Sequence, residues 1–318
     1  MDSSVEQIIA DARAETGEVD YSPDNGVPQS VPLEAANTGQ EILQGLIFPI
    51  DADFFLRQTT MAGVINQVGY TLPENDYLGG SVSLIEYSPD GTLPNYYELK
   101  RATVRFQNGD RSNEPRRFFI FGGADTAKFY IDPYLASSVG SFRVSYTAAL
   151  DSLAVRSGRI ATKGASRDAS NLNYLKLTLD STDATLDDSK FTDPGYICIN
   201  DKAGTVTYYN LSYDSYDASS HTFILSANQA VSVGTIADGD YVTYGKYTTT
   251  HSKLKKPCKP YLSAMTKFAL YSARSSVDSE EQKQVLSNLL PAILGAHEHK
   301  NRGRKHIPYS GKFIRARL

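Results

Sequence analysis

The sequence holds few groups suited to catalysis or metal binding. Of its five histidines, only His297 and His299 lie close together, with Glu298 between them. Alternate residues of a helix point about 200° apart, so two such imidazoles on one helix cannot share a metal ion. We interpret this cluster as a surface-exposed helix end. The sequence also lacks the phosphate-binding loop, the dinucleotide-binding glycine motif, the nucleophile elbow and the zinc-protease motif.

Two closely spaced acid pairs are the remaining candidates for acid–base chemistry. Asp187 precedes Asp188, and Asp238 lies two residues before Asp240. Both pairs lie among turn-forming residues, where carboxylates accept hydrogen bonds from the nearby backbone. A carboxylate pair assembled from distant segments, as in glycosidases, stays open. We predict no catalytic residue, no cofactor and no metal site, and therefore no enzyme.

Cysteine and tyrosine usage narrows the class of protein further. Cys198 and Cys258 are the only cysteines, which predicts neither a disulfide framework nor a zinc site and fits a reducing compartment. The chain has 21 tyrosines and no tryptophan, and nine of the tyrosines lie between residues 174 and 247. Clustered tyrosines can line a glycan-binding face or fill strand positions. We favour packing.

Charge is distributed unevenly along the 318 residues. The net charge of −4 divides into −8 for residues 1–45, −6 for residues 46–250 and +10 for residues 251–318. The start of the chain shows no secretory leader, and the apolar runs are far shorter than the roughly 20 residues of a membrane span. We expect a soluble protein, made in a cytoplasm, whose basic end binds an acidic partner or nucleic acid.

Helical patterns occur at both ends of the chain. Residues 4–15 repeat apolar side chains at helical spacing, with Ser3 or Ser4 as N-cap and Gly17 as the stop. Residues 18–32 are predicted to form a linker or extended arm, and residues 34–46 could form a second helix. Residues 262–269 and a segment from Asp278 predict two further helices, and Pro291 should kink the last one or begin a new segment.

Strand patterns fill the middle of the chain. Residues 81–87, a turn at residues 89–91 and residues 96–106 predict a hairpin. With residues 117–121, 128–132 and 141–146 it should form one small antiparallel sheet. Five further strand-like runs between residues 160 and 250 predict a separate β-sandwich or barrel; they are residues 175–179, 196–199, 205–209, 222–225 and 240–244.

The predicted fold class is therefore α+β. A helical bundle from both chain ends carries a small antiparallel β-subdomain, an inserted all-β domain and an extended basic C-terminal arm. We expect domain boundaries at residues 1–155 for the N-terminal helices and β-subdomain, 156–250 for the inserted domain, and 251–318 for the C-terminal helices and arm.

Three segments resemble the head-to-tail connector (adaptor) proteins of tailed bacteriophages. Residues 70–78 are similar to the family's aromatic-x-Leu-Pro-x-Asp-Tyr-Leu phrase, with one residue inserted. Residues 116–133 resemble its strand pair, and residues 140–146 its final strand, which ends at a tyrosine. The inserted β domain resembles small modules of phage structural proteins, with residues 175–182 as its entry strand.

The resemblance implies a structural virion protein of the neck, assembled in the host bacterial cytoplasm. Its partners would be further copies of itself in a ring, usually of twelve, the portal protein above and a tail or nozzle protein below. Genomic DNA would pass through the channel without sequence recognition, and no membrane is involved. C-terminal arms would reach up onto the portal.

The C-terminal arm is the candidate binding site. We expect it to be disordered in the free subunit and ordered on the portal, because glycines and a proline prevent a continuous helix and like charges repel. Apolar anchors alternate with bases, which suits a groove with an apolar floor and an acidic rim. The predicted portal-docking residues are Arg302, Arg304, Lys305, Ile307, Tyr309, Lys312, Phe313, Ile314, Arg315, Arg317 and Leu318.

Two other functions stay open on the sequence alone. The tyrosine-rich β domain is compatible with a virion carbohydrate-binding or cell-wall-degrading protein. The arm, with seven bases and no acid from Lys300 onward, is compatible with nucleic-acid binding.

Overall fold

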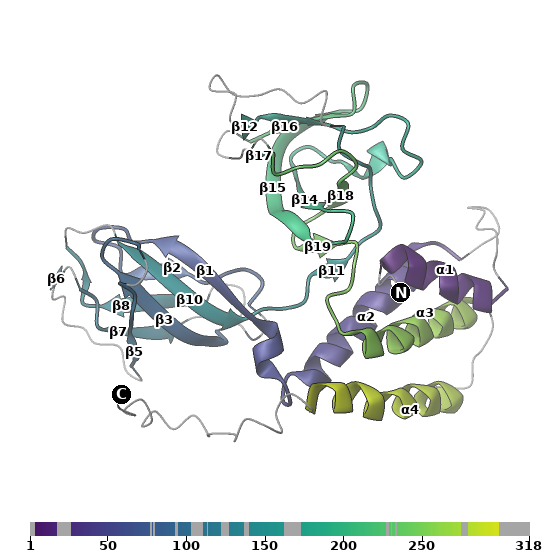
Figure 1. Ribbon diagram of the computed structural model, residues 1–318, viewed down its shortest axis with the longest axis horizontal. Coiled ribbons are helices and arrows are strands. Elements are labelled where there is room, and N and C mark those ends of the chain that lie inside the picture. Colours follow the sequence, from purple (N-terminus) through teal and green to yellow (C-terminus); the bar gives the residue numbers. More distant parts are fainter. Residues whose placement is uncertain are drawn as a thin grey trace. The chain divides into compact units, whose positions relative to one another are not determined.

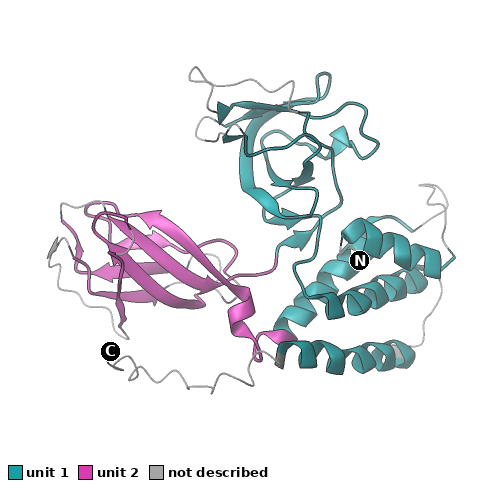
Figure 2. Cartoon of the chain, viewed as in Figure 1, with its two compact units in different colours: residues 1–45, 151–299 teal, residues 46–150, 300–318 magenta. Residues whose placement is uncertain are grey.

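The computed structural model describes residues 4–17, 27–76, 78, 80–92, 95–102, 111–112, 114–121, 127–136, 140–161, 173–226, 229, 231–232, 234–274 and 279–298. The chain divides into two compact units, residues 1–45 with 151–299 (unit 1) and residues 46–150 with 300–318 (unit 2) (Figure 2). In the described ranges four α-helices accompany several β-sheets, one of them a half-barrel (Figure 1). The predicted mixture of helix and sheet is confirmed.

The first helix of unit 1, α1 (Val5–Glu15), follows its sequence signals closely. The Ser4 side chain accepts a hydrogen bond from the Gln7 backbone N–H at 3.3 Å, which satisfies one of the free donors at the helix start. Gly17 has a φ of 74° two residues beyond the last turn. The predicted helix, its N-cap and its stop are confirmed.

The second helix, α2 (Ser30–Ile47), begins earlier than the sequence pattern predicted. The turn-forming residues of the 18–32 stretch, which include Pro23, Pro28 and Pro32, predicted a linker that continues to residue 32, and for residues 30–32 this prediction is wrong. Pro32 lies in the first turn, where backbone N–H groups have no partner within the helix, so the missing N–H has no cost. On the buried side, Leu262 and Met265 approach Gly39 so closely that a Cβ there would lie 3.2 Å from each.

The C-terminal helices of unit 1 are α3 (Lys259–Arg274), which follows the short 3-10 helix η4 (Lys256–Cys258), and α4 (Ser279–Glu298). Helix α4 runs through Pro291, so no new segment begins there. The proline is exposed, on a side of the helix where the carbonyl that loses its donor is accessible to solvent. Helices α1 and α3 are joined by ion pairs between Lys259 and Asp11 at 3.4 Å and between Lys267 and Glu15 at 3.0 Å.

The β part of unit 1 is a five-stranded antiparallel half-barrel, in the order β13-β16-β15-β14-β18 (Figure 1). All five predicted strand regions are present, and Tyr213, Phe223 and Val242 in its core are completely buried. The elements are β11 (Ser152–Leu153), β12 (Asn173–Tyr174), β13 (Lys176–Thr178), the 3-10 helix η3 (Asp188–Lys190), β14 (Gly195–Asn200), β15 (Val206–Asp217), β16 (Thr222–Leu225), β17 (Val231–Ser232), β18 (Tyr241–Tyr244) and β19 (Thr248–Thr249).

Unit 2 contains two four-stranded sheets around one core, where the sequence predicted a single antiparallel sheet. One sheet has the order β1-β10-β3-β4 and the other β2-β8-β7-β5. The elements are η1 (Ala52–Phe55), β1 (Leu56–Ala62), β2 (Gly69–Thr71), β3 (Val82–Ser88), β4 (Tyr97–Glu98), β5 (Lys100–Arg101), β6 (Arg111–Ser112), β7 (Arg117–Phe121), β8 (Lys128–Asp132), β9 (Tyr134–Leu135) and β10 (Ser141–Thr147).

The single-sheet prediction was wrong because the chain changes sheet between β4 and β5 and again between β8 and β10. After the turn at residues 89–91 the chain pairs with β3 only through β4, which confirms the hairpin over a short stretch. At Leu99, which is 1% exposed, the chain enters the shared core, and β5 then pairs in parallel with β7 of the second sheet. An apolar residue at a crossing has the same alternation as one within a strand, so the change of sheet is invisible in the sequence pattern.

Candidate functional site

Two short strands of unit 1 lie side by side at the points where the chain enters and leaves the half-barrel. The chain enters through β11 and leaves through β19, and the two strands pair in parallel. The backbone N–H of Ser152 donates to the Tyr247 carbonyl at 2.8 Å, and that of Ala154 donates to the Thr249 carbonyl at 2.9 Å. This pairing ties entry and exit together. We call the polar contacts around it the joint.

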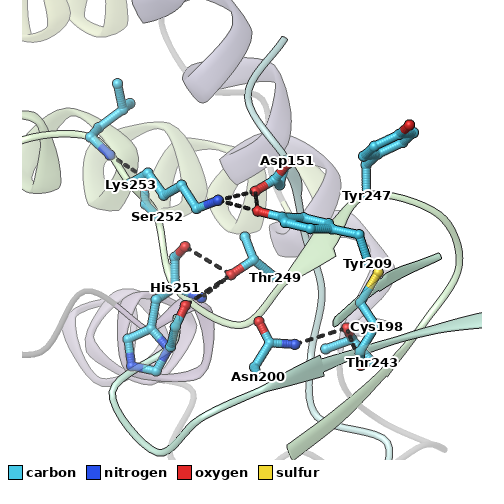
Figure 3. Close-up of polar contacts among 12 residues, drawn as sticks. Asp151, Cys198, Asn200, Tyr209, Thr243, Tyr247, Thr249, His251, Ser252 and Lys253 are labelled. Carbon is cyan, nitrogen blue, oxygen red and sulfur yellow. Dashed lines mark hydrogen bonds and ion pairs between the residues drawn. The ribbon is translucent and has the colours of Figure 1, made fainter. Parts of the chain in front are cut away.

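A fully buried carboxylate lies at the centre of the joint. The Asp151 side chain has no exposed surface, and it accepts hydrogen bonds from the Lys253 ammonium and, at 2.8 Å, from the Tyr209 hydroxyl (Figure 3). The Lys253 Nζ also lies 5.1 Å from the centre of the Tyr209 ring. A buried charge is tolerated only when it is paired and hydrogen-bonded, and Asp151 meets both conditions.

Two amides on α2 contact the backbone of the connecting segments. Gln40 donates to the Asp151 carbonyl at 2.9 Å and accepts from the Ser252 hydroxyl at 2.9 Å. Asn37 donates to the Leu153 carbonyl at 3.0 Å and accepts from the Leu153 N–H at 2.7 Å. Helix α2 therefore holds both segments in a defined register.

Helix α1 is attached to the joint by an arginine. Glu6 accepts from the Nε of Arg156 at 2.7 Å and from its backbone N–H at 3.0 Å, and the guanidinium lies 4.4 Å from the centre of the Tyr241 ring. The hydrogen bond to Glu6 raises the pKa of Arg156 above its ordinary value. The Val5 N–H also donates to the Thr250 carbonyl at 2.9 Å.

Buried side-chain hydroxyls and an amide fill the space between the half-barrel and the exit segment. The Asn200 amide donates to the Thr243 hydroxyl at 3.2 Å, and the Thr243 and Thr248 hydroxyls lie 2.8 Å apart (Figure 3). Gly204 has a φ of 82°, and a Cβ there would lie 2.1 Å from the His251 ring, so only glycine fits this close approach. These groups are engaged in structural hydrogen bonds. Hydrogen bonds of this kind fix the orientation of the groups that they join. Among the described residues, the buried Asn200 amide oxygen has no hydrogen-bond partner.

The described residues give no sign of metal binding or of a membrane span. Among them, no three histidine, cysteine or acidic side chains cluster as metal ligands would. The helices within the same ranges are too short or too polar to cross a bilayer.

Both cysteines are buried within unit 1. The Cys198 thiol contacts Asn210 and the Gly245 carbonyl, and burial raises the pKa of the Cys258 thiol to about 11. A thiol with that pKa is roughly one part in a thousand thiolate at pH 8. We expect neither cysteine to react with a thiol reagent in the native protein and both to react after denaturation. Rapid labelling of Cys258 in the native protein would contradict this burial.

The structure corrects the interpretation of the histidine cluster. His297 is completely buried, with its Nδ1 3.1 Å from the Lys255 ammonium, so the exposed helix end predicted there is wrong for this residue. It lies one turn after the buried Ile293 on the face of α4 that packs inward. His299 lies outside the described residues.

The acid pairs act as turn-stabilising groups. Asp187 accepts from the Ser189 hydroxyl at 2.5 Å, and Asp240 accepts from the Ala237 N–H at 2.8 Å. Asp188 accepts from the Tyr216 hydroxyl and lies 3.1 Å from the His221 ring. These contacts support the structural interpretation of both pairs.

The nine tyrosines of the half-barrel region are used mainly for packing. Tyr174 and Tyr213 are buried in its core, and Tyr208 and Tyr216 pack against the same core. The most exposed are Tyr196 and Tyr244, at 39% and 36%. The Lys246 ammonium lies 4.5 Å from the centre of the Tyr196 ring.

The three segments that carry the connector resemblance meet in the core of unit 2. Tyr70 pairs with Phe129 across β2 and β8, and its ring lies 5.1 Å from that of Phe129 and 4.8 Å from that of Phe142. The Tyr146 hydroxyl donates to the buried Asn75 amide oxygen at 2.9 Å. The described parts of residues 70–78, 116–133 and 140–146 therefore contribute to one core.

The acid in the first of these segments organises a turn. Asp76 accepts hydrogen bonds from the N–H groups of Leu78, Gly80 and Ser81, and from the Ser81 hydroxyl. The turn leads directly into β3. The motif is thus used to build the fold.

The predicted portal-docking residues, Arg302 to Leu318, all lie outside the described residues. The joint, by contrast, was not singled out in the sequence. One signal was present: Gln40 and Gln44 lie between the buried apolar residues of α2, and buried amides require partners. The partners of Gln40 are Asp151 and Ser252, which lie more than 100 residues away along the chain, so the sequence does not identify them.

No family model matches this chain, and no curated protein matches it either.

Proposed function

We propose that the protein is a structural subunit of the head-to-tail adaptor ring of a tailed bacteriophage. The supporting observation is the convergence of the three connector-like segments in one core, through Tyr70, Phe129, Phe142 and the Asn75–Tyr146 hydrogen bond. In this proposal the ring joins the portal to the tail, continues the DNA channel and carries out no catalysis.

The finer architecture belongs to the same proposal. Helices from both chain ends form a bundle around the channel; the ion pairs between α1 and α3 support this pairing of the two ends. Residues 156–250 are an inserted domain that projects from the ring, and residues 300–318 are an arm that binds the portal. The ring, usually of twelve copies in such proteins, contacts a tail or nozzle protein below and DNA without sequence recognition. Assembly takes place in the bacterial cytoplasm.

The joint gives the inserted domain a fixed direction in this proposal. Contacts from α1, α2 and the two connecting strands hold the half-barrel to the helices at several points. A subunit that transmits position from one ring to the next requires such a defined orientation, whereas a flexible linker would not supply it.

Imaging tests the proposal directly. A small tag inserted in the exposed turn at residues 218–220 of the half-barrel should appear at the neck of the virion, between head and tail. A tag located on the capsid surface or at the distal tail would contradict an adaptor role.

The alternative is a virion carbohydrate-binding or cell-wall-degrading protein, and one observation favours it. Tyr196 and Tyr244 expose aromatic surface on the half-barrel, with Lys246 beside Tyr196. Aromatic rings of this kind can stack on sugars. Binding on a glycan array, or release of peptidoglycan fragments, would favour this function over the ring.

A further inference from the structure

The outer face of one sheet in unit 2 has the composition of a protein interface. In the sheet β2-β8-β7-β5, the residues that alternate with the buried core positions point away from the core. Strand register places them in three rows. The rows are Lys100 with Arg117 and Asp132, then Phe119 with Tyr130 and Gly69, then Phe121 with Lys128 and Thr71.

The middle row is tightly packed. The rings of Phe119 and Tyr130 stack with centres 5.0 Å apart and planes within 7°. Tyr130 lies so close over Gly69 that a Cβ there would be 2.9 Å from its ring. The glycine therefore allows the stacked pair to lie against the sheet, and the surface around it is preorganised.

The outer rows are exposed and basic. Phe121 is 68% exposed, the highest fraction among the large apolar side chains of the described residues. Its register partner Lys128 is exposed, and so is Lys100 at the other end of the face. Aromatic residues and arginine are enriched in protein interfaces, and this face carries the exposed Phe121 and Arg117. Its two lysines supply positive charge at the rim.

The composition favours a protein over nucleic acid as the occupant. Phe119 is only 8% exposed and Tyr130 is half-buried against it, so Phe121 is the one largely exposed ring among the described residues of this face. Asp132 places a negative charge within the face. Single-strand platforms stack successive bases on several rings along a positive groove. This face fits a surface that combines acidic and apolar side chains.

Helix α2 carries such a surface. Glu34, Glu41 and Ile42 are exposed and lie on one side of the helix, because residues seven and eight apart share a face. Ile42 is 41% exposed and Leu46, one turn later, is 36% exposed. The helix contains no basic residue.

We propose that the outer face of the sheet β2-β8-β7-β5 of one copy binds the Glu34–Glu41–Ile42 side of α2 in a neighbouring copy. This interface rests on the proposed ring. A closed ring of identical subunits requires two different, complementary surfaces on each subunit, and this chain presents a basic aromatic face and an acidic apolar one. Phe121 would bind beside Ile42, with Lys128 opposite Glu41 and Lys100 opposite Glu34.

Charge exchange tests the proposal. Lys100→Glu with Lys128→Glu should weaken self-assembly roughly tenfold or more, and so should Glu34→Lys with Glu41→Lys, because like charges then face each other. Mixing the two variants should restore assembly close to wild type, since each supplies the partner that the other lacks. The control is Lys176→Glu with Lys202→Glu, two exposed lysines of the half-barrel, which should assemble normally. Sedimentation gives the assembled mass, and circular dichroism verifies folding.

A cross-link provides a second measurement. A chain that carries both Phe121→Cys and Ile42→Cys should form disulfides between copies on oxidation. The control, Leu175→Cys with Ile42→Cys, should form none. The native cysteines do not interfere, because both are buried. If the charge variants assemble as well as the wild type and no cross-link forms, this interface is overturned, but the proposed ring still stands. Wild-type protein that stays monomeric at every concentration and forms no cross-link would overturn both. If the wild type binds DNA and the Lys100/Lys128 variant loses that binding while it still assembles, nucleic acid is the partner of this face and the proposal is overturned.

Discussion

Deleting residues 303–318 should leave a folded, soluble subunit that no longer attaches to portal rings. Every described helix and strand lies before residue 299, so none of them is removed by the deletion. The deleted segment carries the apolar anchors Ile307, Tyr309, Phe313, Ile314 and Leu318. Such anchors should provide most of the binding energy, because each exposed charge pair contributes only about 0–1 kcal/mol.

Two matched variants separate the anchors from the charges. Replacing Phe313 and Ile314 by serine should abolish most portal binding, whereas replacing Arg315 and Arg317 by glutamine should weaken it modestly and reduce its salt dependence. Co-sedimentation of each variant with portal rings measures the effect. Normal attachment of the truncated chain would show that the arm is dispensable.

Replacing Lys253 by methionine should destabilise unit 1 by about 2–4 kcal/mol, because the substitution leaves the fully buried Asp151 carboxylate without its cation. The Tyr209 hydroxyl still donates to that carboxylate, so the protein should stay folded. Asp151→Asn should cost less, about 1–2 kcal/mol, because Lys253 is 36% exposed and remains solvated.

Chemical denaturation of both single variants and the double variant completes the measurement. The double variant should be less destabilised than the sum of the two single variants, since each one removes the same pair. Lys176→Met, at an exposed strand position outside the joint, should change stability by less than about 0.5 kcal/mol. Equal effects at Lys253 and Lys176 would show that the joint contributes nothing.

Local signals in the sequence predicted local structure well. Serine at the N-cap, apolar residues at helical spacing and a following glycine are each short-range features, and together they defined α1 correctly. The five strands of the half-barrel were predictable for the same reason, since alternation and turn residues operate within a few positions. Pro32 was misleading because a proline breaks a helix interior but suits a first turn.

Long-range packing accounts for what the sequence could not predict. The crossing at Leu99 and the contact of Gln40 with Asp151 both depend on partners brought together by the fold. The sequence predicted an exposed helix end at His297, whereas its spacing from Ile293 places it on the inward side of α4. For polar residues the choice between surface and interior depends on a distant partner, here Lys255.

The copy number of the protein in the virion tests the adaptor assignment most directly. Quantitative mass spectrometry of purified particles, with the portal protein as internal standard, gives this number. We expect a fixed ratio that corresponds to one complete ring per particle, usually twelve copies in such adaptors. Absence from the particle, or a copy number in the hundreds as for a capsid component, would contradict the adaptor role.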